Sequence, residues 1–304
     1  MRHPAPQATA TATARQRRGP SFLMALPAVL FFGLFALVPL LGVLVLSFAS
    51  WDGLGAPSFV GLDNWFRVLE RPQTHSSLML TMGFVALSYL VQAPVALMLG
   101  VFMAGQQRYR AFLSVLFFLP LLFSSVAVGL TFQALLSPNY GISSALPFDW
   151  LPAQWLGNPQ LALYVVIFVV AWCFVPFHAL LYQAGVRQIP ATIYEAATID
   201  GAGRVRQFFS ITLPQLRYTI ITSSTLMLVG SLTYFDLIFV LTQGGPGSAT
   251  RILPLDMYIT GFRNFDMGGA SVIAVILVAV GLSLSLLLNK ISGSSKMESD
   301  KAGL

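Results

Sequence analysis

Charged residues and cysteines are scarce in this chain of 304 residues. Asp, Glu, Lys and Arg together make up 9% of the sequence, whereas hydrophobic residues make up 56%. In an ordinary soluble domain about a quarter of the residues are charged, so the composition excludes that class and indicates a membrane protein. The single cysteine, Cys173, excludes an internal disulfide and a cysteine-based metal cluster.

Lysine is rarer still, and its positions exclude one kind of ATP-binding site. The three lysines, Lys290, Lys296 and Lys301, all lie near the carboxyl terminus. A G-x-x-x-x-G-K-[ST] phosphate loop needs a lysine after its glycines, so the chain contains no P-loop. The glycine-rich residues 244–247 have no lysine and are typical of a tight turn. If the chain drives active transport, either another subunit hydrolyses ATP or the energy comes from an ion gradient.

Six long apolar segments contain most of the hydrophobic residues. They are residues 22–48, 77–104, 111–136, 161–184, 218–241 and 270–288. Each is near or beyond the roughly 20 residues that a helix needs to cross a bilayer, and none contains Lys or Arg. The sequence therefore predicts an all-α polytopic membrane protein with six transmembrane helices.

These segments also divide the chain. A transmembrane domain is predicted over residues 22–288, with a polar loop at 187–217 and a short tail at 289–304. Residues 1–21 are rich in Ala, Thr, Pro, Gln and Arg and lack apolar periodicity, so they are predicted to be disordered.

The basic residues predict the orientation in the membrane. The termini and loops on one side of the six segments carry 13 Lys and Arg residues, and the loops on the other side carry 4. By the positive-inside rule, both termini, the 105–110 turn and the 187–217 loop face the cytoplasm. The outer loops, 49–76 and 137–160, are too short to hide a soluble domain. No basic stripe with interleaved aromatic residues appears, so the high pI does not indicate a nucleic-acid partner.

The 187–217 loop has a pattern of its own. Thr192 and Glu195 have the spacing of a capping box, which predicts a short helix beginning near Thr192. Gly201 suits the left-handed conformation that ends such a helix. A second helix is predicted from about residue 204 to 212, with Pro214 in the first turn of the next membrane helix. Local chemistry leaves two interpretations open: the helix pair lies on the bilayer surface, or it docks on a partner.

The same loop resembles the E-A-A signature of integral-membrane subunits of binding-protein-dependent ABC importers. The signature residues are Glu195-Ala196-Ala197, Gly201 and Ile211-Thr212-Leu213-Pro214. Further segments look like those of carbohydrate-type permeases for maltose, glycerol-3-phosphate or multiple sugars: residues 155–159, 234–236, 241–247 and 265–268. The chain departs from the pattern at Tyr218, where many relatives have proline, and near Val205, where they have tryptophan.

The resemblance implies a permease with the type I ABC importer fold in a bacterial or archaeal cytoplasmic (inner) membrane. It implies a second homologous permease, an extracytoplasmic solute-binding protein that delivers sugar, and a cytoplasmic ABC ATPase dimer. ATP and Mg²⁺ would bind to that ATPase, so this chain would be neither an enzyme nor a cofactor carrier. The residues expected to couple to the ATPase are Glu195, Ala196, Ala197, Asp200, Gly201, Ala202, Ile211, Leu213 and Pro214.

Polar residues within the apolar segments are candidates for a substrate path. They are Gln92, Gln133, Thr225, Ser231, Tyr234 and Asp236. Their alternative role is to bridge neighbouring helices. Five prolines predict kinks or breaks in the membrane helices: Pro27, Pro39, Pro94, Pro120 and Pro176.

Three rival functions are weighed against the importer. An ion-coupled secondary carrier of small polar solutes needs ionisable groups within its spans, and here only His178 and Asp236 qualify. A membrane-embedded enzyme needs a converging catalytic set, and the sequence shows no metal-ligand spacing, no nucleophile with a matched base and no carboxylate pair in the spans. A purely structural anchor would not need the 187–217 loop.

Overall fold

The computed structural model describes residues 22–105, 107–146 and 154–292. The predicted disordered segment 1–21, residues 293–304 of the predicted tail and residues 147–153 of the second outer loop lie outside the described residues. The chain divides into two compact units, Met1–Val43 and Leu44–Leu304.

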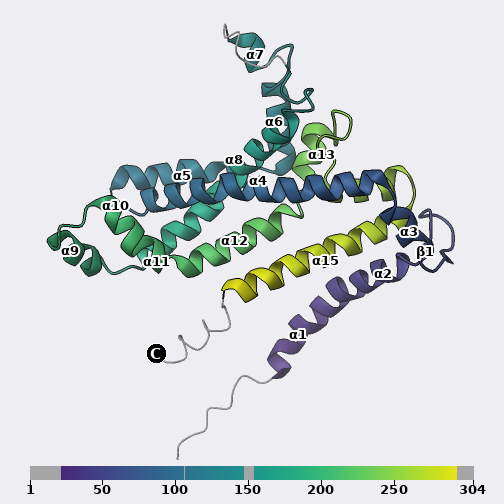
Figure 1. Ribbon diagram of the computed structural model, residues 1–304, viewed down its shortest axis with the longest axis horizontal. Helices are drawn as coiled ribbons and strands as arrows, with labels where there is room; N and C mark the ends of the chain where they lie inside the picture. Colours follow the sequence, from purple (N-terminus) through teal and green to yellow (C-terminus); the bar gives the residue numbers. More distant parts are fainter. Residues whose placement is uncertain (1–21, 106, 147–153, 293–304) are drawn as a thin grey trace, which may run out of the picture. The chain divides into compact units, whose positions relative to one another are not determined.

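The described elements are almost all helical (Figure 1). The first part of the chain contains α1 (Phe22–Phe32), the π-helical turn η1 (Gly33–Leu37), α2 (Val38–Leu46), β1 (Ala49–Ser50), β2 (Ser58–Phe59), α3 (Asp63–Leu69), α4 (Pro72–Met103), α5 (Arg108–Leu122), α6 (Ser125–Leu135), α7 (Ile142–Ala145) and α8 (Ala162–Arg187). The second part contains α9 (Ala191–Ile199), α10 (Arg204–Gln207), η2 (Phe208–Thr212), α11 (Leu213–Gln215), α12 (Arg217–Ser231), α13 (Asp236–Thr242), α14 (Leu253–Tyr258), η3 (Ile259–Arg263) and α15 (Met267–Ser292). The strands β1 and β2 pair as a two-residue antiparallel ribbon.

The long apolar helices agree with the predicted all-α membrane fold. Four are continuous and long enough to cross a bilayer: Met24–Leu46, Pro72–Met103, Ala162–Arg187 and Met267–Lys290. Two further spans are pairs of helices, Arg108–Leu122 with Ser125–Leu135, bent by 96°, and Arg217–Ser231 with Asp236–Thr242, bent by 48°. Each predicted apolar segment thus corresponds to one continuous helix or one bent pair.

The helix Met24–Leu46 makes up nearly all of the described part of the first unit. Its mean hydropathy is 2.8, and none of its most apolar 18 residues is buried. A helix that is hydrophobic all round requires an apolar environment on every face. A lipid bilayer supplies one.

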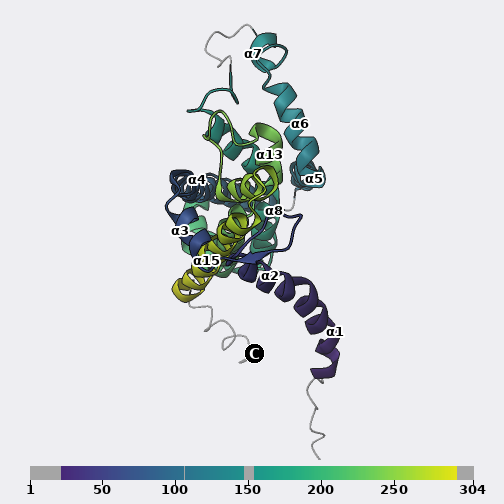
Figure 2. The same ribbon diagram turned by 90° about the vertical axis from the view of Figure 1, so that its right-hand side faces the viewer.

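Pro94 and Pro176 lie inside the continuous helices α4 and α8, whereas Pro120 lies in the last turn of α5, directly before the α5–α6 break. The α5–α6 break begins at Phe123, whose backbone is extended (φ −82°, ψ 146°). Ser124 then caps α6, because its hydroxyl accepts a hydrogen bond from the Ala127 amide at 3.2 Å. Figure 2, turned by 90°, shows α6 and α7 leading away from α4.

The α12–α13 break follows from packing around Tyr234. Its ring stacks on Phe174 of α8, with centroids 4.8 Å apart, and meets Phe84 of α4 edge-on at 6.2 Å. Aromatic pairs in these geometries are worth about 0.5–1.5 kcal/mol beyond the area they bury. The backbone leaves the helical path between Leu232 and Phe235, and the ring fits between α4 and α8.

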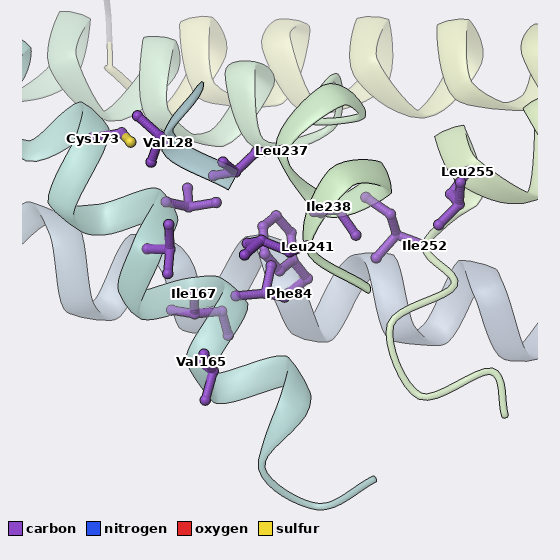
Figure 3. Close-up of a cluster of buried hydrophobic side chains, with 13 residues drawn as sticks. Phe84, Val128, Val165, Ile167, Cys173, Leu237, Ile238, Leu241, Ile252 and Leu255 are labelled. Atoms are coloured by element: carbon purple, nitrogen blue, oxygen red, sulfur yellow. The ribbon is translucent and has the colours of Figure 1, made fainter. Parts of the chain in front are cut away.

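The main hydrophobic core of the second unit joins α4, α6, α8, α13 and the start of α14 (Figure 3). Phe84, Val128, Ile167 and Ile238 are among its buried members. The helices α4 and α8 come closest at Gly100, where an added Cβ would lie 2.6 Å from the Ala179 carbonyl oxygen and 2.6 Å from the Tyr182 Cβ. Only glycine permits this approach.

Two ion pairs fasten the segments around α14 and α15. Arg251 donates to the fully buried carboxylate of Asp256, with its Nε 2.9 Å from Oδ1. Arg67 of α3 donates to both oxygens of Asp266, which also accepts a bond from the Gly269 amide at the start of α15. Burial alone would raise the pKa of Asp266, but the bonds from Arg67 and Gly269 outweigh it and hold that pKa below its ordinary value.

Candidate functional site

The segment Ala191–Thr212, which comprises α9, the Gly201 turn, α10 and η2, lies at one end of the second unit (Figure 1). It lies outside the spans, and α9 has no buried residue. Apolar side chains nevertheless point outward from it: Ile199 is 87% exposed and Val205 is 72% exposed. Single exposed apolar residues are common on protein surfaces, so these two alone do not identify a contact surface.

The helix bounds confirm most of the local prediction for this segment. Gly201 has φ +77°, the left-handed conformation expected of it. The second helical stretch runs from Arg204 to Thr212, as predicted, although its second half is the π-helical turn η2.

Two details were predicted wrongly. The helix α9 begins at Ala191 with Pro190 as its N-cap, so Thr192 lies inside the first turn and no capping box forms with Glu195. Proline ahead of the helix fixes an extended backbone there, with φ −58° and ψ 134°, and this sets the start of the helix. Pro214 lies in the three-residue helix α11, and the membrane helix α12 begins after it, at Arg217.

Hydrogen bonds tie α9 to the second helix. Gln207 donates from its Nε2 to the Thr198 hydroxyl at 3.0 Å and to the Ala202 carbonyl at 2.9 Å. The hydroxyls of Tyr194 and Thr212 lie 2.9 Å apart and share a hydrogen bond. The segment is therefore one preorganised body rather than two independent helices.

The expected coupling residues lie together in this body. Glu195 and Ala196 are exposed on α9, Asp200 and Gly201 are exposed in the turn, and Ala197 is half-buried. Ala202, Ile211 and Leu213 are half-buried, and Pro214 is exposed. Sequence reasoning missed Gln207, Tyr194 and Thr212, and no local pattern identifies a bond between residues 18 positions apart.

The segment is attached directly to two spans. Leu216, which follows α11, is 1% exposed. An added Cβ on Gly185 of α8 would lie 2.7 Å from the Leu216 Cδ2 and 3.0 Å from the Thr219 Oγ1 of α12, so both side chains pack on this glycine. A displacement of the segment is thus passed to α8 and α12.

The residues predicted for a substrate path are dispersed. Gln92 and Ser231 are fully buried, and Ser231 donates to the Met227 carbonyl of its own helix. Thr225 likewise donates to the Ile221 carbonyl. Asp236 is exposed at the first position of α13.

Gln133 and Tyr234 contact other helices. Gln133 of α6 donates from its Nε2 to the carbonyls of Val240 and Leu241 at 2.7 and 3.2 Å. Tyr234 packs between α4 and α8 as described above. Both side chains bridge helices, which was the alternative role set out for this group.

His178, the other ionisable group noted in the spans, is 3% exposed. Its Nδ1 lies 2.9 Å from the Ser223 hydroxyl of α12. In the described part of the chain, no group of three His, Cys, Asp or Glu side chains could hold a metal ion.

A hollow of about 850 Å³ lies among α6, the end of α13 and residues 154–157. Its lining includes Gln133, Tyr140, Gln154, Trp155, Thr242 and Pro246. This hollow is here named the α6–α13 pocket. The sequence did not predict it, although residues 155–159 and 241–247, which contribute to its lining, were both noted there.

Comparison with known proteins identifies the family. Residues 96–295 match the model of the family described as "Binding-protein-dependent transport system inner membrane component". The probable ABC transporter permease protein YurN of Bacillus subtilis is 32% identical over 91% of this chain and 97% of that protein. The trehalose/maltose transport system permease protein MalF of Thermococcus litoralis is 30% identical over 89% of this chain and 92% of that protein.

The fold is also similar to that of a solved permease. A chain in the crystal structure of a bacterial alginate ABC transporter, in complex with its alginate pentasaccharide-bound periplasmic protein, matches with a TM-score of 0.78. The match covers 89% of this chain and 93% of that chain at 23% identity. Matches of this length with the family model and with curated permeases show that the chain belongs to the binding-protein-dependent transport system inner membrane component family, and it is a multi-pass transport permease rather than an enzyme.

Proposed function

We propose that this chain is the transmembrane subunit of an ATP-driven sugar importer. It forms the translocation path with a second permease and couples to a separate cytoplasmic ATPase dimer through the Ala191–Thr212 segment. The observation that supports this best is that the segment lies outside the spans, is held together by its own hydrogen bonds and exposes several of the expected coupling residues.

The shape of the segment favours docking over lying on the bilayer. A helix that lies on a membrane needs its apolar residues on one face, with charged residues opposite. Here Ile199 is at the end of α9, Val205 is in the next helix, and Glu195 and Asp200 are exposed beside them. A mixed surface with a few apolar anchors suits a cleft in a protein partner.

The energy would come from outside the chain. The sequence has no P-loop lysine, so ATP and Mg²⁺ would bind to the partner ATPase. ATP shifts the transporter between inward-open and outward-open states because it binds the two states of the ATPase unequally. The bias of basic residues, 13 against 4, supports a cytoplasmic position for this segment and for both termini.

The substrate class follows from the relatives. The Thermococcus relative is named for trehalose and maltose, and the solved transporter carries alginate, so a saccharide delivered by an extracytoplasmic binding protein is the proposed cargo. Among the polar residues of the spans, exposed Asp236 and half-buried Gln133 and Thr225 are retained as path residues in this proposal. Gln92, Ser231 and Tyr234 are buried or half-buried in this structure, so they belong to the path only in another transport state that exposes them.

A co-purification experiment tests the coupling. The chain is expressed with its partner permease and ATPase, and the complex is isolated through a tag on this chain. Ile199→Asp places a charge at the expected contact. Leu54→Asp is the matched control because Leu54 is also an exposed aliphatic residue, 89% exposed in the 49–76 loop, far along the chain from the segment. We expect wild type and Leu54→Asp to retain the ATPase and Ile199→Asp to lose most of it.

Two outcomes would contradict the proposal. Equal retention by the two variants would show that the segment is not the contact. Absence of ATPase from the wild-type preparation, with the two permeases still together, would favour the ion-coupled carrier, whose uptake a protonophore stops while ATP is preserved.

A further inference from the structure

We propose that the α6–α13 pocket is a binding subsite for an uncharged saccharide. The inference rests on the proposed sugar import and deepens it, because it names the kind of sugar and the residues that would hold it. Ligand pockets commonly measure about 300–1,000 Å³ and combine apolar walls with a few polar groups. The volume of about 850 Å³ falls in this range.

Trp155 gives the pocket a fixed aromatic wall. Its Nε1 donates to the Ser143 hydroxyl at 2.6 Å, and its ring packs against the main hydrophobic core. The indole is therefore held in one orientation before any ligand arrives. The C–H face of a pyranose is apolar and packs on such a ring, whereas the hydroxyls at its edge remain available for hydrogen bonds.

Tyr140 and two amides complete the set of groups. Tyr140 is 74% exposed and is one of the lining residues. Gln133 uses its Nε2 for the Val240 and Leu241 carbonyls, so its Oε1 is the amide atom left to accept a bond from a sugar hydroxyl. Gln154 is the other amide residue of the lining. Aromatic faces and amides together suit a saccharide better than a purely apolar solute.

The described lining carries no charge, and this favours some saccharides over others. Among the described residues, none that lines the pocket is Asp, Glu, Lys, Arg or His. A uronate sugar that entered would give up water around its carboxylate with no cation to pair with, which is costly. Neutral sugars meet no such penalty.

A second hollow in the same unit serves as a contrast. It measures about 600 Å³ and lies among α12, α14 and α15. Thr233 and Ser285 are the polar residues in its lining, and aliphatic side chains supply most of the rest. Its described lining contains no amide side chain, so it offers fewer kinds of hydrogen-bonding group than the α6–α13 pocket.

Direct binding to the complete transporter tests the subsite. The complex of this chain, its partner permease and the ATPase is placed in nanodiscs without the binding protein and titrated by saturation-transfer NMR. The probes are neutral disaccharides of hexoses, pentoses and N-acetylhexosamines, with an alginate pentasaccharide as the acidic probe. We expect saturation transfer to at least one neutral probe and none to the acidic one.

Variants assign the signal to the pocket. Tyr140→Ala and Trp155→Leu each remove an aromatic face and are expected to weaken binding roughly threefold to tenfold. Trp155→Phe keeps a face but loses the bond to Ser143, so it should bind almost as wild type. Tyr164→Ala is the control, because Tyr164 is 60% exposed on α8 and does not line the pocket.

The failures are distinguishable. No binding of any neutral probe by wild type, equal binding of the acidic probe, or wild-type affinity in both Tyr140→Ala and Trp155→Leu would overturn the subsite. ATPase retention is measured on the same preparations. Retained ATPase with unaltered sugar binding in the variants refutes the subsite alone, whereas loss of the ATPase from wild type refutes the proposed coupling alone.

Discussion

Replacing Gly201 by valine should uncouple the permease from its ATPase without unfolding it. Gly201 has φ +77°, and an added Cβ would meet no atom within 4 Å. The substitution therefore creates no clash in this chain, and its whole cost is conformational. The left-handed conformation costs a residue with a Cβ about 1–2 kcal/mol, with a β-branched residue at the upper end.

That penalty acts on the turn that positions α10 against α9. The turn is closed by bonds from the Gly201 amide to the Thr198 carbonyl, at 3.0 Å, and from the Ala202 amide to the Ala197 carbonyl, at 2.8 Å. A cost of about 1–2 kcal/mol lowers the equilibrium constant for forming this turn roughly fivefold to thirtyfold. The apparent dissociation constant of the ATPase should rise by up to this factor, because only the competent conformer binds, and the bonds from Gln207 to Thr198 and Ala202 oppose the loss.

Gly203 provides a matched control two residues away. It also has open space around the added Cβ, but its backbone is extended (φ −67°, ψ 165°), which valine adopts without strain. Binding of purified ATPase to the permease pair is measured by interferometry, and uptake is measured in proteoliposomes. We expect a loss of up to about thirtyfold for Gly201→Val and little change for Gly203→Val; equal behaviour of the two would refute the role of the left-handed turn.

Three further predictions concern stability, each measured by unfolding of the purified complex. Gly100→Ala should cost about 1–3 kcal/mol because its Cβ meets α8 at 2.6 Å, whereas Gly83→Ala on the same helix, with nothing within 4 Å, should be neutral or stabilising. The depressed pKa of Asp266 implies stabilisation that is present above the ordinary value of 3.8 and is lost as the pH falls through the lower folded pKa. Asp266→Asn should abolish this acid-dependent loss, which is below about 1 kcal/mol because the arginine partner is 52% exposed. Asp256→Ala should cost about 3 kcal/mol by leaving Arg251 unpaired, and adding Arg251→Met should recover most of it; no recovery would contradict the ion-pair explanation.

The spans and the fold class were predictable because length and apolarity are properties of the chain itself. The break between α12 and α13 was not. Tyr234 leaves the helical path to pack between Phe84 and Phe174, which are far from it in sequence, and neither is signalled near the break. The prolines gave a mixed result. Pro120 lies in the last turn of α5, directly before the α5–α6 break, whereas Pro94 and Pro176 lie in continuous helices, since a membrane helix tolerates a proline where neighbouring groups satisfy the freed carbonyl.

The Ala191–Thr212 segment shows the same division. Gly201 and the helix from residue 204 to 212 follow from local chemistry and were predicted correctly. The capping box failed because Pro190 moved the helix start ahead of Thr192. The bond between Tyr194 and Thr212, which makes the segment rigid, depends on the fold of the whole segment and has no local signature.

Under the proposed function, the rigid Ala191–Thr212 segment and the breaks before α6 and α13 act together in coupling. The Ala191–Thr212 segment is fixed to α8 and α12 through Leu216, and α8 is fixed to α4 by the close approach at Gly100. Gln183 of α8 adds a bond from its Nε2 to the Met103 carbonyl at the end of α4, at 2.8 Å. A push on the segment therefore reaches α4, α8 and α12 as one body. The helices α6 and α13, which line the α6–α13 pocket, are each separated from their preceding helix by a break, and they pack on α4 and α8 in the main hydrophobic core. A movement of that body therefore reaches the pocket through these contacts. Coupling at one end and sugar handling at the other thus require no shared residues, because the continuous helices carry the motion and the broken ones respond to it.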